Sequence, residues 1–510
     1  MGIIALHKQE RTSIIKRIMK FFDEIEVFLW LPTDKEKKDE NIVFSIGRPE
    51  RIHDLLKSLN KENQEAILAT YKTTDILAIM SNSACSKLSY DNLIEKIADH
   101  EENSEKFISS GVLTQLLSES ELNELANLIL DKIISPETFY SLILLPHVDI
   151  TDNIKINNTF SLIKAAPDII DNFLTDDPVT KEEAFPLEEM KTYLLIKQQG
   201  YPEGIYEKPL ALVQLESKLK VLLGLCLVQE IFEKPTNKPF FLQEPQQVAG
   251  TEFIGIFKRF VQYEYDDDGY EIGPIEVNED IFDHDEFGEY KSGKYKFYHS
   301  NNLSLRTENM YLINSLTMSR SATEPLHKLK MVKGGNTEKL AKSEELKPPS
   351  EFLKEKFEKQ IKNILDSVDK YGEAIKTAAE WYFEALCAEN ETFKFIQYTI
   401  AIESLLGDPD KRDRVTERLS DRCAYLLGEN QKEREEIKES FEEIYDIRSA
   451  IIHRRSLRLQ EKDSRSLAQA EVLTRRLIRK EINIYTELIG TSINENIEIS
   501  PDNESRRDTS

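Results

Sequence analysis

Apolar side chains in the last third of the chain recur at intervals of three and four residues, which is the spacing of an amphipathic helix. In the first such stretch the pattern runs through Ile364, Val368 and Tyr371 without a break. We predict five helices, and they cover residues 357–386, 392–406, 415–426, 437–453 and 467–488. Because the connections between them are short and polar, we expect an antiparallel helical bundle over residues 351–490.

The first 145 residues are predicted to be mainly helical, with short strands at residues 26–31 and 41–46. The sequence Ser118-Glu119-Ser120-Glu121 precedes an apolar periodic stretch and is typical of a capped helix start. The fold class that follows is mainly α, with a C-terminal antiparallel helical bundle attached to a mixed α+β N-terminal region.

Residues 146–325 are predicted to form an α+β middle region. Its expected elements are strands at 148–150, 154–156 and 193–196 and a largely buried helix at 210–232. Residues 326–350 contain two glycines and two prolines in pairs and are typical of a linker. The polar residues 491–510 are predicted to be a disordered tail.

The charge is strongly acidic but uneven. The net charge of −25 argues against a protein that coats nucleic acid in general. The segment 263–290 contains twelve Asp or Glu and no Lys or Arg, whereas residues 448–480 contain ten Lys or Arg and three Asp or Glu. Asp266-Asp267-Asp268-Gly269 invites a calcium interpretation, but a glutamate is missing where an EF-hand loop ends. There are two alternatives to calcium binding. The acidic segment could be a solvated loop, or it could cover an RNA groove by mimicking phosphate.

Cysteine usage and hydropathy exclude several classes of protein. The four cysteines are far apart and form no CxxC pair, so neither a zinc site nor a disulfide framework is predicted. Cys226 and Cys423 lie within apolar helical patterns and are expected to be core residues. No signal peptide and no apolar run long enough to span a bilayer is visible. We therefore expect a cytoplasmic protein with no membrane partner, no metal and no cofactor.

Arg448 and His453 stand at the end of the fourth predicted helix, and together they offer chemistry on RNA. A ribose 2′-hydroxyl that attacks its own 3′-phosphate needs a base, and the departing 5′-oxygen needs an acid; histidine can take either role. The arginine fork can stabilise the charge that develops on the phosphate. Each chain supplies one such histidine, so a symmetric homodimer would provide both base and acid. An equivalent spacing at Arg48 and His53 lacks the bundle context and is interpreted as a chance match.

The residues around this pair carry a family resemblance. The segment from Ile444 to His453 is similar to the signature of HEPN domains, an arginine separated from a histidine by four to six residues. The segments 395–407 and 418–428 resemble the corresponding helices of the Apea-like HEPN group. Position 449 is Ser where many members carry Asn, Asp or His, and Arg454 stands where glycine is frequent.

The resemblance implies an all-helical bundle, dimerisation, and a metal-independent endoribonuclease that leaves 2′,3′-cyclic phosphate ends. Similar proteins with a large N-terminal region act in bacterial anti-phage abortive infection by cutting host or phage RNA, often tRNA. By this resemblance the N-terminal region would sense a phage-derived trigger or restrain the bundle. Arg448 and His453 would be catalytic.

Other residues are candidates for supporting roles. Ser449 is a candidate phosphate contact, and Glu403 could orient Arg448 or Arg422, or could be a satisfied buried acid. RNA-binding candidates are Arg454, Arg455, Arg458 and Arg422, which supply positive charge for a phosphate backbone. Tyr445 is assigned to packing.

Two structural alternatives remain open. His453 could be a helix-end histidine favoured by the helix dipole, with Arg448 paired to an acid. The bundle could also bind RNA or nucleotide without cutting it, or serve only for oligomerisation.

Overall fold

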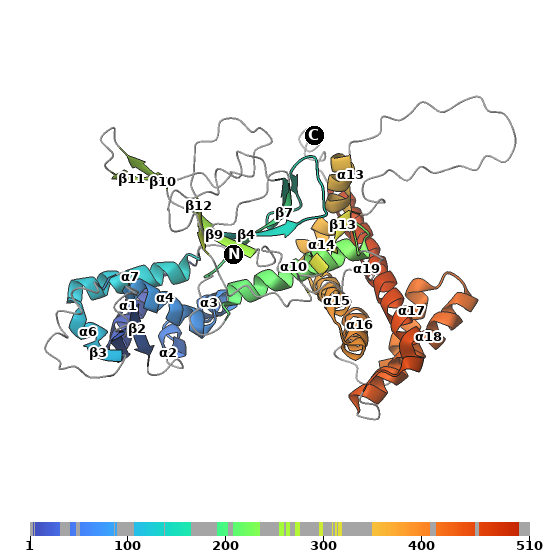
Figure 1. The fold of residues 1–510 in the computed structure, drawn as a ribbon, viewed down its shortest axis with the longest axis horizontal. Coiled ribbons are helices and arrows are strands. Elements are labelled where there is room, and N and C mark those ends of the chain that lie inside the picture. Colours follow the sequence, from blue (N-terminus) through green and yellow to red (C-terminus); the bar gives the residue numbers. More distant parts are fainter. Residues whose placement is uncertain are drawn as a thin grey trace, which may run out of the picture. The chain divides into compact units, whose positions relative to one another are not determined.

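The described part of the chain is mainly helical, with antiparallel sheets in the N-terminal half (Figure 1). The computed structural model describes residues 4, 6–30, 41–46, 52–85, 87–88, 107–136, 138–164, 191–201, 208–234, 254–259, 262–265, 271–275, 295–298, 309, 312–313, 315–318, 349–407, 415–453 and 458–498. The chain folds as two compact units, of which the first contains residues 1–141, 197–215 and 255–303, and the second contains the rest.

The first unit packs helices against a small antiparallel sheet. The sheet has the order β2-β1-β3, formed by Asn41–Ile46, Ile25–Trp30 and Phe107–Val112, so both strands predicted from the sequence are confirmed. The helices of this unit are α1 (Lys8–Phe21), α2 (Ile52–Leu56), α3 (Lys61–Thr70), α4 (Thr73–Cys85), α6 (Leu113–Leu116) and α7 (Glu119–Ile134).

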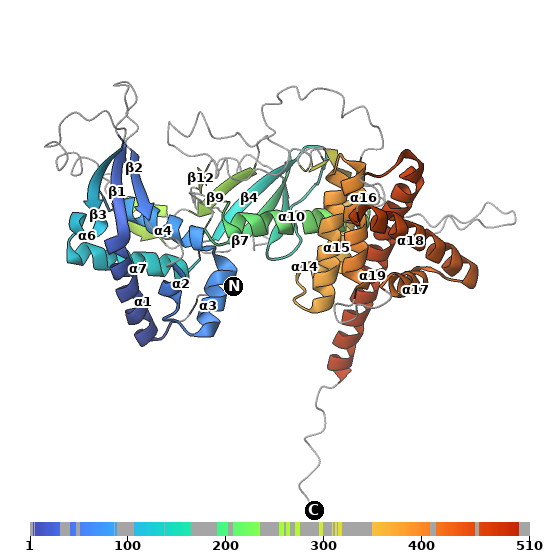
Figure 2. The same cartoon turned by 90° about the horizontal axis from the view of Figure 1, so that it is seen from below.

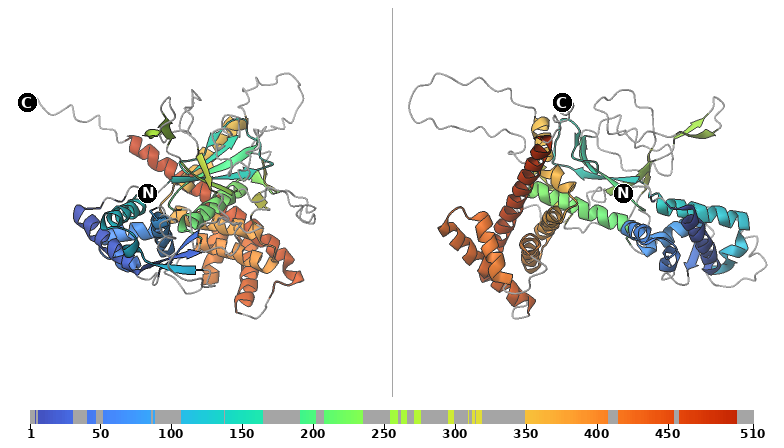
Figure 3. Two further views of the ribbon diagram at one scale, coloured as in Figure 1. Left: turned by 60° about the vertical axis from the view of Figure 1, so that its left-hand side comes forward. Right: turned by 180° about the vertical axis from the view of Figure 1, so that it is seen from behind.

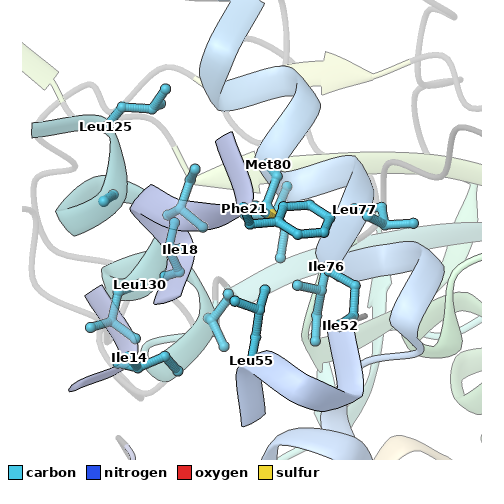
Figure 4. Close-up of a cluster of buried hydrophobic side chains, with 14 of the residues drawn as sticks. Ile14, Ile18, Phe21, Ile52, Leu55, Ile76, Leu77, Met80, Leu125 and Leu130 are labelled. Atoms are coloured by element: carbon cyan, nitrogen blue, oxygen red, sulfur yellow. The ribbon is translucent and has the colours of Figure 1, made fainter. Parts of the chain in front are cut away.

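Apolar side chains from four of these helices form the core of the first unit. Figure 4 shows α1, α2, α4 and α7 directing Ile18, Leu55, Met80 and Leu130 toward one another. The capping prediction for α7 is confirmed, because the Ser118 side chain accepts the Glu121 N–H while the Glu121 carboxylate accepts the Ser118 N–H at 2.7 Å. This exchange satisfies donors that a helix start leaves without partners.

A second, larger sheet has the order β12-β9-β4-β7-β6-β5. Its strands are Tyr295–Tyr298, Ile254–Arg259, Thr138–Leu145, Thr192–Gln199, Phe160–Lys164 and Ile154–Lys155. Small two-stranded sheets join β10 (Gln262–Tyr265) to β11 (Glu271–Ile275) and β8 (Phe232–Glu233) to β13 (Thr317–Met318).

The expected strands at 154–156 and 193–196 are present, but the one at 148–150 is wrong. Val148 and Ile150 are buried without belonging to a sheet ladder, and the nearby His147 makes only an isolated bridge to Thr317. Residues 266–270 and 276–294 lie outside the described residues, and with them the calcium interpretation and most of the acidic segment 263–290.

Helix α10 (Leu210–Val228) confirms most of the buried helix predicted at 210–232, but it ends at Val228, and Phe232 belongs to β8. Its C-terminal half belongs to the second unit, where it crosses α15 (Figure 2). A β-carbon on Gly224 would lie 2.1 Å from the Ala379 carbonyl oxygen of α15, so glycine is needed for this close approach. The Arg479 guanidinium donates to the Val228 carbonyl and ties the end of α10 to the bundle.

The C-terminal region of the second unit is helical, as predicted (Figure 3). Its helices are α13 (Pro349–Lys356), a π-helical turn (Phe357–Lys362), α14 (Asn363–Leu365), α15 (Lys370–Cys387), α16 (Glu391–Leu406), α17 (Val415–Leu427), α18 (Gln431–Ile452) and α19 (Ser464–Glu498). Ser466 bonds Glu443 and Arg476 bonds Glu433, so α18 and α19 run antiparallel.

Two predictions for this region need correction. The stretch 357–386 is not one helix, because it breaks at residues 366–369 and α15 begins anew with the Asp369 carboxylate accepting the N–H groups of Tyr371 and Gly372. The tail predicted to be disordered from residue 491 is helical as far as Glu498, where α19 ends. Of the predicted linker 326–350, residues 326–348 lie outside the described residues, as do residues 499–510, whereas Pro349 and Ser350 already belong to α13.

Cys226 and Cys423 are buried, as predicted, and burial raises the pKa of both thiols. Within the described ranges, no three histidine, cysteine or acidic side chains gather in a way that could hold a metal ion. None of the described helices is both long and apolar enough to cross a bilayer.

Candidate functional site

The candidate site lies at the C-terminal end of α18. The Asn430 side chain caps the start of this helix by accepting the Glu433 N–H, and Ile437, Phe441 and Ile444 bury its apolar face. The helix ends at Ile452, and His453 is its C-cap. Arg448 therefore lies in the last turns of α18 and His453 at its end, as the sequence predicts.

Arg448 is held by an acid from a neighbouring helix. Its Nη2 lies 3.0 Å from Oε1 and 3.2 Å from Oε2 of Glu403, which α16 contributes one turn before its end. Both side chains keep 29% of their surface exposed. The charge-assisted hydrogen bond from Nη2 to Oε2 orients the guanidinium, and this exposure leaves the pair within reach of a ligand in solution. Of the two arginines considered as partners of Glu403, the structure pairs it with Arg448.

Tyr445 contacts the same carboxylate. Its hydroxyl donates to Glu403 Oε1 at 3.0 Å, and its ring stacks on Phe441 with centroids 4.6 Å apart. Burial raises the pKa of Tyr445, and the negative charge of Glu403 raises it further. The hydroxyl therefore stays protonated and remains a donor at neutral pH. The sequence pattern assigns Tyr445 to packing alone, although its spacing of three residues from Arg448 places both on one helix face.

His453 is exposed and lies on a different side of the helix. Its N–H still donates to the Ser449 carbonyl at 3.0 Å, so helical geometry persists to the cap. Five helical residues amount to about 500° of rotation, so the side chains of Arg448 and His453 leave the helix about 140° apart. The imidazole therefore faces solvent, whereas the guanidinium faces α16.

The other candidate residues have different surroundings. The Arg422 guanidinium donates to the Leu406 carbonyl at 2.5 Å and so caps the end of α16. Ser449 is partly exposed, and Arg458 is exposed shortly before α19 begins. Arg454 and Arg455 lie outside the described residues.

The equivalent spacing at Arg48 and His53 lies in the first unit and not in the C-terminal helical region. His53 is an exposed residue of α2 in the first unit, and Arg48 lies outside the described residues. It therefore offers a matched control for His453.

Comparison with known proteins adds no relative. The chain has no significant match among protein-family models, curated proteins or solved structures.

Proposed function

We propose that this protein is a metal-independent endoribonuclease of bacterial anti-phage defence that cuts host or phage RNA, tRNA among the candidates. The observation that supports the proposal is an arginine held by Glu403 in the last turns of α18, with an exposed histidine at the end of the same helix. The biological setting comes from the resemblance to Apea-like HEPN domains.

In the proposed reaction a neutral imidazole accepts the proton of a ribose 2′-hydroxyl. The 2′-oxygen attacks the adjacent phosphorus, and the bond to the 5′-oxygen of the next nucleotide breaks. A second, protonated imidazole gives its proton to that 5′-oxygen, so one product ends in a 2′,3′-cyclic phosphate and the other in a free 5′-hydroxyl. Arg448 donates to the phosphate oxygens as negative charge builds up on them.

Because each chain supplies one His453, the proposal includes a homodimer in which two copies contribute acid and base. The direction of the side chains is consistent with this division. Within one chain the imidazole and the guanidinium diverge by about 140°. One phosphate can therefore contact an imidazole and a guanidinium more readily when they come from two different chains. The basic candidates Arg454, Arg455 and Arg458 would bind the flanking phosphates.

The test is to sequence RNA ends from cells that express the wild type, Arg448→Ala or Arg476→Ala. Arg476 is the matched control, because it is also ion-paired to a glutamate, with Nη2 3.1 Å from Glu433 Oε1, and lies on α19. We expect new cyclic phosphate ends with the wild type and with Arg476→Ala, and their loss with Arg448→Ala.

The competing account is a bundle that binds RNA without cutting it or that only oligomerises. The Arg448–Glu403 ion pair is equally compatible with that account. If the three proteins give the same RNA ends in the presence of phage, the bundle has this non-catalytic role.

A further inference from the structure

We propose that Tyr445 is a positioning residue for the reaction, acting on Arg448 through Glu403. The inference rests on the proposed function, since it assigns Arg448 a task at the phosphate. It goes beyond that function in naming a third member of the group that holds the guanidinium in place.

The contacts form a closed arrangement on one carboxylate. Arg448 and Tyr445, three residues apart on α18, both direct donors at Glu403 on α16. Oε1 accepts from the tyrosine hydroxyl and lies 3.0 Å from the arginine Nη2, whereas Oε2 accepts from Nη2 as its one donor among the described residues. Tyr445 is therefore the donor that distinguishes the two oxygens and sets the rotation of the carboxylate.

The tyrosine is itself a fixed support. Its side chain is 5% exposed and stacks on the buried Phe441 ring with an interplanar angle of 12°. Arg448 and Glu403 are long, partly exposed side chains that lose considerable rotamer freedom when they are ordered. Because the packed ring of Tyr445 has few alternative positions, its hydroxyl holds the Glu403 carboxylate in one orientation. An exposed ion pair by itself would not do so.

The contact with Glu403 occupies only part of the Arg448 guanidinium. One nitrogen, Nη2, contacts Glu403, and the guanidinium has five N–H groups in total. The oriented guanidinium can then donate other N–H groups to a phosphate while it keeps its contact with Glu403. This is the advantage of preorganised donors.

The first test compares Tyr445→Phe with Tyr425→Phe in RNA cleavage. Phenylalanine keeps the ring on Phe441 and removes only the hydroxyl. Tyr425 is the matched control, because it is an exposed tyrosine of α17 whose ring contacts the Arg434 guanidinium. We expect kcat to fall about tenfold in Tyr445→Phe with KM changed less than about twofold, and no change in Tyr425→Phe. A rise of about tenfold in KM with kcat unchanged, or no change in either constant, in Tyr445→Phe would overturn the inference.

The second test needs no activity. Nitrogen-15 relaxation of the arginine side chains reports the mobility of the Arg448 guanidinium in the full chain. We expect its order parameter to fall in Tyr445→Phe while that of Arg476 stays at its wild-type value. An unchanged order parameter for Arg448 would refute the positioning role even if the wild type cleaves RNA. If Arg448 loses order in Tyr445→Phe but the wild-type protein does not cleave RNA, the contacts through Glu403 stand and the proposed function is refuted.

Discussion

Replacement of Gly224 by alanine tests how closely α10 and α15 approach each other. The added β-carbon would meet three backbone atoms of Ala379: the carbonyl oxygen at 2.1 Å, the carbonyl carbon at 2.8 Å and the α-carbon at 3.3 Å. The backbone of a packed helix cannot rotate away as a side chain can. The two helices must therefore separate, or α15 must bend.

Two effects of opposite sign decide how Gly224→Ala changes the free energy of unfolding. Alanine is favoured over glycine inside a helix by about 1 kcal/mol. Overpacking of a well-packed interface costs about 1–3 kcal/mol, and contacts with backbone fall at the upper end. Separation of the helices would also disturb the buried contacts of Gly224's neighbours Leu223 and Leu225. We expect a net loss of about 1–2 kcal/mol in the free energy of unfolding.

The assay is urea unfolding followed by circular dichroism, with the transitions of the two units fitted separately because the chain need not unfold in one step. Val213→Ala is the control, since Val213 lies on the same helix and is 39% exposed. A lower midpoint with an unchanged slope, in Gly224→Ala only, is the expected result. A Gly224→Ala protein as stable as the wild type or more stable would show that the helices do not cross this closely.

Two further predictions concern titration and reactivity. Hydrogen bonds from Tyr485 and from the backbone of Gly372 lower the pKa of Asp369, so its stabilising effect is present above its unfolded pKa and is lost as pH falls through the lower folded value. Stability of Asp369→Asn should therefore fall less steeply below about pH 4, as measured by thermal melts across pH; an unchanged slope would contradict this. The thiol of Cys226, fully buried with a raised pKa, should react with a thiol probe only as fast as its unit unfolds, and rapid labelling in native buffer would contradict its burial.

Much of the C-terminal region was predictable because helical periodicity is a local property. The bounds of α16 and α17 and the end of α18 follow from apolar spacing and from Gly407 and Gly428. The break before α15 was not, since the three-and-four pattern continues across it through Val368. That residue is 93% exposed, and the cap at Asp369 decides the local structure.

The wrong strand at 148–150 and the wrong start of the tail lie outside the C-terminal bundle that the sequence pattern predicts. Val148 and Ile150 are buried, as an alternating pattern suggests, but a strand also needs a partner that local sequence does not specify. Ile489, Ile493 and Ile497 recur every four residues, so helical spacing continues into the predicted tail, and α19 extends to Glu498.

The candidate site was predictable in part. Arg448 and His453 stand out by residue type and position, and Glu403 by its place in α16. Which arginine Glu403 meets depends on how α16 and α18 pack, and the structure gives Arg448. Tyr445 was missed because an aromatic residue in a helical pattern is normally a core residue. Its hydroxyl contact is a tertiary feature that spacing alone does not reveal.

The central claim is tested most directly by incubating the purified full-length protein with a tRNA pool in the presence of EDTA. The measurement is the number of 2′,3′-cyclic phosphate ends formed by the wild type, His453→Ala and the matched control His53→Ala. Our account predicts cyclic phosphate ends with the wild type and with His53→Ala, and none with His453→Ala. Equal cleavage by His453→Ala and the wild type, or cleavage that stops when EDTA is added, would contradict it.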